Sequence, residues 1–88
     1  MAQVRERMTR TLAEEFSPSH LEVIDESHLH AGHAGARPEG ETHFRVRITA
    51  EAFRGKTRLE RHRMVNAAVA RELAGPVHAL AITAEAPA

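Results

Sequence analysis

Cysteine, tryptophan and tyrosine are all missing from this sequence of 88 residues. Without cysteine the chain has no disulfide, no thiolate nucleophile and no metal site built from its own thiolates. Its seven histidines are therefore its softest metal ligands. Three phenylalanines offer few platforms for stacking nucleic-acid bases, which disfavours recognition of single strands by stacking.

Neither sign of charge dominates, because twelve basic and twelve acidic residues give a formal net charge of zero. Binding to nucleic acid or to an anionic membrane would therefore need a local patch. No run approaches the ~18 consecutive apolar residues of a membrane span. The first residues are amphipathic, unlike the apolar core of a signal peptide. We expect a cytoplasmic protein with no membrane partner.

The length and a hydrophobic content of 42% suit one domain with one core, spanning residues 1–88. Apolar residues spaced by four predict an amphipathic helix from Val4 to Phe16, which Pro18 ends. Alternation then predicts a half-buried strand over 20–26, although Ile24 breaks the pattern. Residues 27–41 contain glycine, proline and histidine without periodicity and predict a long loop.

The second half of the chain begins with a cleaner strand, in which Phe44, Val46 and Ile48 alternate with polar residues. A short turn over 50–55 follows. Thr57 and Glu60 have capping-box spacing, which predicts a helix that runs to Gly75-Pro76. On that helix we expect one apolar stripe, formed by Leu59, Val65, Val69 and Leu73. The polar residues His62 and Asn66 fall within the same stripe, so we expect them at the edge of the core.

A buried strand is predicted over 77–83, and residues 84–88 resemble a flexible tail. The long loop suggests that the first two strands form an antiparallel hairpin. The helix between the second and third strands predicts a right-handed crossover, which makes those two strands parallel. The fold class is therefore α+β, with a mixed three-stranded sheet and helices packed on one face.

Histidines form the densest group of possible metal ligands. His28, His30 and His33 lie in the loop and His43 begins the next strand, with a spacing that matches no specific zinc motif. His78 opens the last strand and is either a ligand or a core-edge residue bonded to backbone.

Four residues that could serve catalysis are adjacent along the chain: Asp25, Glu26, Ser27 and His28. Neighbours on a strand alternate faces, so they do not form a catalytic triad. We expect no enzyme.

A basic run is the second feature that chemistry could use. Such a run at a helix start can bind phosphates, or it can be a solvated face. Its members are Arg54, Lys56, Arg58, Arg61 and Arg63.

Several short motifs, in this order, resemble those of the BolA family across nearly the whole chain. They are Val23–Ser27, Glu41–Phe44, Phe53–Gly55, Arg61–Val65 and Val77–Ala81. The resemblance implies an αββααβ fold similar to class II KH domains. The GxxG loop with which KH domains clamp nucleotides is not visible, since this chain has Gly55-Lys-Thr-Arg.

The resemblance also implies a function. BolA-like proteins pair with monothiol glutaredoxins, and the heterodimer can hold a bridging [2Fe–2S] cluster in iron–sulfur trafficking or iron sensing. The glutaredoxin and glutathione supply thiolates, and the BolA-like protein supplies two ligands. One is the histidine of the VHAL motif, here His78, and the other lies in the first loop, where we favour His33 over His30. We expect no cofactor in the isolated chain.

Imidazole ligands bind only after losing their protons, so we expect acid to weaken such a complex, with loss of absorbance between pH 8 and about pH 6. Some family members are described as DNA-binding transcriptional regulators. That is the alternative function, and the basic run is where DNA would bind.

Overall fold

The computed structural model describes residues 3–26 and 42–88. The loop expected over 27–41 therefore lies outside the described residues. Along the chain the elements are α1 (Gln3–Phe16), β1 (His20–Asp25), β2 (His43–Thr49), the short 3₁₀ helix η2 (Glu51–Phe53), α2 (Arg58–Ala68), α3 (Ala70–Ala74) and β3 (Ala79–Glu85). No helix in these ranges is long and apolar enough to cross a membrane.

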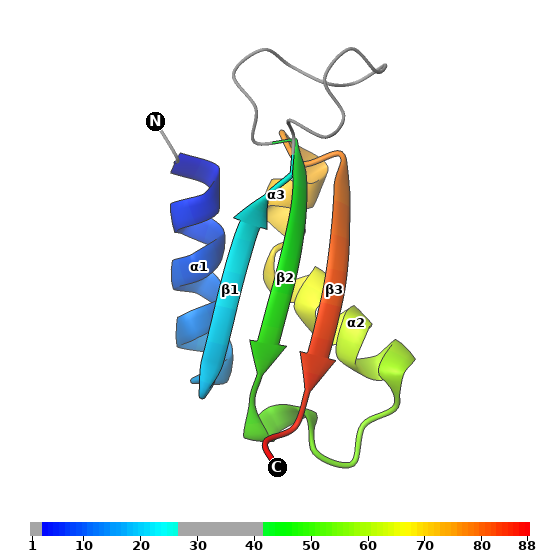
Figure 1. The fold of residues 1–88 in the computed structure, drawn as a ribbon. Coiled ribbons are helices and arrows are strands. Elements are labelled where there is room, and N and C mark those ends of the chain that lie inside the picture. The colour runs from blue at the N-terminus through cyan, green and yellow to red at the C-terminus, as the bar shows by residue number, and fades with distance from the viewer. Residues whose placement is uncertain (1–2, 27–41) are drawn as a thin grey trace.

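The strands form a mixed sheet with β2 in the middle (Figure 1). β1 pairs with β2 in antiparallel register, with Val23 opposite Val46. β3 pairs with β2 in parallel register, with Ile82 opposite Val46. The predicted hairpin and the predicted parallel crossover are both confirmed. As a result β2 and β3 both start at the same end of the sheet.

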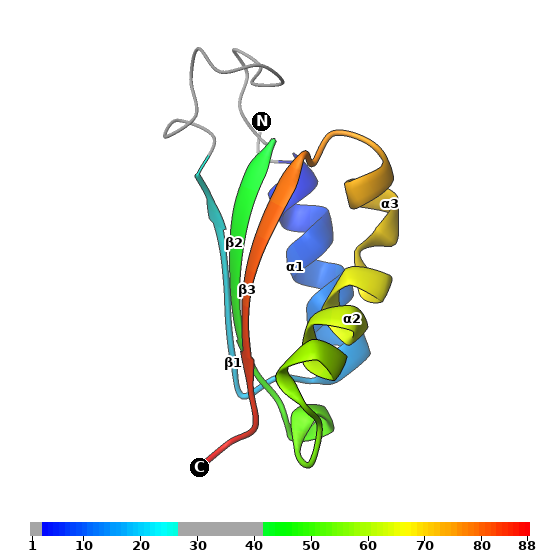
Figure 2. The same ribbon diagram turned by 90° about the vertical axis from the view of Figure 1, so that its right-hand side faces the viewer.

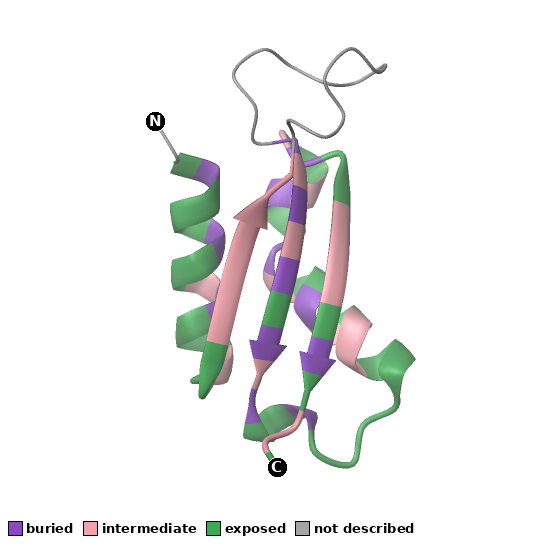
Figure 3. Ribbon diagram, in the orientation of Figure 1, coloured by how far each residue is buried: buried purple, intermediate pink, exposed green. Residues whose placement is uncertain are grey.

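The three α-helices lie on one side of the sheet, and no described helix covers its other side (Figure 2). Burial alternates along β2 as its sequence predicts, because Phe44, Val46 and Ile48 face the helices (Figure 3). They form one core with apolar residues of α1 and α2. Phe53 of η2 is fully buried, and its ring centre lies 5.0 Å from that of Phe16.

The predicted helix from Thr57 to Gly75 is interrupted. Val69 has φ −109° and ψ 28° and separates α2 from α3, so the two segments keep Val65 and Val69 buried while the chain bends. The predicted stripe is wrong for Leu59, whose side chain is 59% exposed. The first turn of α2 extends beyond the outer edge of β3, where no strand lies beneath it (Figure 1). Of the two polar residues expected at the core edge, His62 is half-buried and Asn66 is exposed.

The last strand runs from Ala79 to Glu85, two residues later than the sequence predicts. It starts late because the Val77 N–H donates to the Glu72 carbonyl at the end of α3 instead of joining the sheet. It ends late because the Glu85 carbonyl accepts from the Ala50 N–H, and Ala84 is buried. These two residues therefore belong to the sheet and not to a flexible tail over 84–88.

Candidate functional site

Two histidines meet at the end of the sheet where β2 and β3 begin. His43 is the first residue of β2, and His78 immediately precedes β3. Parallel pairing places His43 opposite Ala79, the neighbour of His78. The two imidazole rings are nearly parallel, with centres 6.3 Å apart and planes inclined by 21°. The structure thus brings together two of the histidines that the sequence singles out.

Thr42 holds both histidines in place. It is fully buried, and its Oγ1 lies 2.8 Å from Nδ1 of His43. Its backbone carbonyl accepts from the N–H of His78 at 2.7 Å and from that of Ala79 at 3.3 Å. One residue therefore orients the His43 ring through its side chain and positions His78 through its main chain. No motif or spacing in the sequence points to this role of Thr42.

The surroundings of the pair are polar and partly open. His78 is exposed and His43 is half-buried. The Glu26 N–H donates to the His43 carbonyl at 2.7 Å, and the Glu26 carboxylate pairs with Arg45 at 2.9 Å. Glu26 and Thr42, which flank the segment that carries the other histidine candidates, both contact His43.

The candidate ligands His30 and His33 lie outside the described residues. Within residues 3–26 and 42–88, no three histidine, aspartate or glutamate side chains converge as a metal site would require. The described part of the chain therefore offers a pair of imidazoles. A neutral imidazole nitrogen is a good ligand for iron, zinc or copper, and a centre here needs further ligands from elsewhere.

The five basic residues of the predicted phosphate-binding run have different roles. Arg54 forms an ion pair with Glu51, with Nη2 3.1 Å from Oε2, and donates to the Pro87 carbonyl at 3.1 Å. The hydrogen bond from Arg54 lowers the pKa of the Glu51 carboxyl. Arg54 therefore ties η2 to the C-terminal residues.

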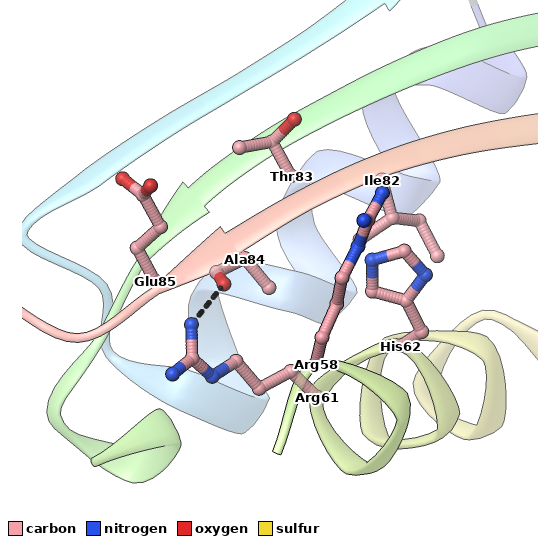
Figure 4. Close-up of a pocket in the computed structure, with 7 residues that line it drawn as sticks. All are labelled: Arg58, Arg61, His62, Ile82, Thr83, Ala84 and Glu85. Atoms are coloured by element: carbon pink, nitrogen blue, oxygen red, sulfur yellow. Dashed lines mark hydrogen bonds between the residues drawn. The ribbon is translucent and has the colours of Figure 1, made fainter. Parts of the chain in front are cut away.

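Arg61 is likewise occupied by the fold. Its Nε donates to the Lys56 carbonyl and its Nη1 to the Ala84 carbonyl, both at 3.0 Å (Figure 4). Arg58 lines a groove beside Arg61, whereas Lys56 and Arg63 are exposed elsewhere on this part of the chain. Two of the five cations thus have intramolecular partners, and the run is not one uniform basic surface.

Comparisons with known proteins agree with this fold. SufE-like protein 1 of Arabidopsis thaliana, described as chloroplastic/mitochondrial, is 44% identical over 86 residues, covering 93% of this chain and 23% of that protein. Human BolA-like protein 1 is 53% identical over 77 residues, covering 88% of this chain and 53% of that protein. The chain thus spans about a quarter to a half of the length of these relatives.

Among solved structures, the BolA domain of SufE1 from Arabidopsis thaliana superposes with a TM-score of 0.89 at 40% identity, covering 99% of this chain and 95% of that domain. Residues 12–88 match the family profile described as BolA-like protein. From the order of its elements, its sheet and these matches, the chain belongs to the BolA family.

Proposed function

We propose that this protein pairs with a monothiol glutaredoxin and completes the ligation of a bridging [2Fe–2S] cluster, in iron–sulfur trafficking or in iron and redox sensing. The BolA family is non-enzymatic, and the proposal is accordingly one of binding. We assign His78 as one ligand and His33 or His30 as the other, and we place the heterodimer in the cytoplasm. Glutathione enters with the glutaredoxin.

The observation that carries the proposal is the exposed ring of His78, which lies 6.3 Å from that of His43 and whose backbone bonds to Thr42, the residue that follows the segment with the other candidates. The donor set fits the group, because a chain with no thiol but with exposed imidazoles can complete a cluster whose remaining ligands are a partner's thiolates. When bound, the cluster supplies one-electron redox chemistry and a transferable iron–sulfur unit.

The chain's own residues would act on that site through position and protonation. The Thr42 carbonyl fixes the backbone of His78, which limits the freedom that its ring loses on binding. His78 must be neutral when it binds, so the complex weakens as the imidazole gains a proton. Imidazole ligands also raise the reduction potential relative to an all-thiolate cluster.

The test is to mix the full chain with a monothiol glutaredoxin, glutathione, ferrous iron and sulfide without oxygen. We expect a heterodimer whose visible absorbance and circular dichroism differ from those of the glutaredoxin alone, and that fade between pH 8 and about pH 6. His78→Ala should remove the difference. His20→Ala is the matched control, because His20 is an exposed histidine at the opposite end of the sheet.

His33→Ala and His30→Ala, made separately, identify the second ligand as the variant with the larger spectral change. A spectrum that His78→Ala leaves unchanged would sink the proposal. The alternative function is a DNA-binding regulator that uses the basic run. The described residues do not favour it, because Arg54 and Arg61 already donate hydrogen bonds to carbonyls of the protein itself.

A further inference from the structure

The outer edge of β3 has unpaired backbone groups. The sheet order places β3 at an edge, and no described strand pairs with its outer side. The Ala84 carbonyl points outward, because it accepts from Arg61, whereas the Glu85 carbonyl points inward to the Ala50 N–H. Since backbone groups of successive strand residues point to opposite edges, those of Leu80 and Ile82 also point outward. Such an edge is a template for another strand.

A groove runs along this edge, between β3 and the start of α2. It holds about 290 Å³ and is lined by Arg58, Arg61 and His62 on the helix and by residues 82–85 on the strand. Figure 4 shows the Arg58 and His62 side chains beside Ile82, while Arg61 reaches the Ala84 carbonyl. The Arg61 hydrogen bond therefore closes the edge at Ala84 and leaves the Leu80–Ile82 stretch open.

The walls of the groove carry more positive than negative charge. Arg58 and Arg61 face it with Glu85 as the acidic lining residue. Glu60, in the same turn of α2, is engaged with the Thr57 N–H at 2.8 Å. Leu59 adds an exposed apolar side chain on that turn. A second copy of the chain would bring like charges together at this edge, whereas an acidic segment would complement them.

We propose that the outer edge of β3 binds an extended acidic segment of a partner protein as an additional strand. Strand addition supplies main-chain hydrogen bonds for affinity and alternate side chains for specificity. The segment's carboxylates at alternate positions face Arg58, and its other side chains lie over the side of the sheet that no described helix covers. This binding needs no cluster, so it can fail or succeed independently of the function proposed above.

The probe is an eight-residue peptide of alternating glutamate and threonine, blocked at both ends and added at millimolar concentration to the full chain. Nuclear magnetic resonance and hydrogen exchange then follow each amide. We expect the amides of Leu80 and Ile82 to gain protection, because they face outward. Those of Ala81 and Thr83 should change little, because they already face β2. A blocked peptide of alternating lysine and threonine should not protect the amides of Leu80 and Ile82.

Two matched controls separate strand addition from loose charge attraction. Arg58→Ala should raise the Kd by up to about five-fold, the upper end of the range for an exposed ion pair, while Arg63→Ala on the same helix should leave it unchanged. A peptide N-methylated on the amides that face β3 keeps its charge but cannot pair, and it should bind at least about ten-fold more weakly, as the loss of two hydrogen bonds requires.

Equal binding of the methylated peptide overturns the proposal, as does an absence of protection at Leu80 and Ile82. Protection of those amides that rises with protein concentration before any peptide is added would instead assign the edge to a second copy of the chain, and would also overturn it.

Discussion

Replacement of Thr42 by valine removes the hydrogen bond between the Thr42 hydroxyl and the ring of His43. Valine has nearly the shape of threonine, so the packing of this fully buried side chain is retained while its hydroxyl is lost. The variant removes the 2.8 Å contact to Nδ1 of His43 but keeps the carbonyl that accepts from His78. The substitution therefore disturbs one histidine and spares the backbone of the other.

The expected cost is about 1 kcal/mol, the net value of a single intramolecular hydrogen bond. The half-buried ring of His43 can form a hydrogen bond with water in place of the bond lost to Thr42. The cost therefore stays below the penalty for a buried group left without a partner. Unfolding 88 residues releases about 0.18 kcal/mol/K of entropy, so 1 kcal/mol lowers the Tm by about 5 °C.

Far-ultraviolet circular dichroism during urea unfolding is the suitable assay, because a chain without tryptophan or tyrosine has little intrinsic fluorescence. Thr83→Val is the matched control, since Thr83 is an exposed strand residue, and such surface changes stay within about 0.5 kcal/mol. If Thr42→Val matches that control, the hydrogen bond to His43 does not stabilise the fold. If the amide resonance of His78 moves more than the ring resonances of His43, the hydroxyl does not act through His43.

Two further changes test the core and the helix start. Phe53→Ala should lower the free energy of unfolding by about 3–5 kcal/mol, a large part of the total for a domain of this size, because the ring is fully buried against Phe16; urea unfolding measures the loss, and Phe53→Leu should recover most of it. The hydrogen bond from the Thr57 N–H lowers the pKa of the Glu60 carboxyl below 4.5. The ionised carboxylate therefore stabilises the fold fully above pH 4.5, and this stabilisation is lost as the pH falls through the lowered pKa. Glu60→Gln should therefore lower the Tm at neutral pH, and the gap to the unchanged protein should narrow as the pH falls below 4.5; a gap that does not change with pH contradicts the capping role.

The order of the elements and the sheet topology were predictable from the sequence because each strand has a separate signal. Alternation in β2 marks its buried face, and the Gly75-Pro76 break separates β3 from the helix. The interruption at Val69 has no such signal, since neither proline nor glycine is present there. Val65 and Val69 are both buried, but residues four apart share one face of an unbroken helix as well, so their burial does not by itself explain the interruption.

The candidate site was predictable only in part. The composition and the VHAL motif single out His78, but its contact with His43 depends on the parallel register that aligns the starts of two strands distant in sequence. The exposure of Leu59 was missed because a helical stripe assumes that a sheet lies under the whole helix, whereas the first turn of α2 extends past β3. Local patterns in the sequence indicate which side chains of a helix face the sheet. Only the assembled sheet determines how many turns of that helix it covers.

The attachment of His78 and Ala79 to one carbonyl of Thr42 has a consequence for local unfolding. Among the described strands, β2 is bonded on both sides and β3 on one side, so the start of β3 can fray while the core stays intact. Fraying would separate His78 from His43 without global unfolding. The hydrogen-exchange rate of the His78 amide therefore reports how often the start of β3 separates from Thr42.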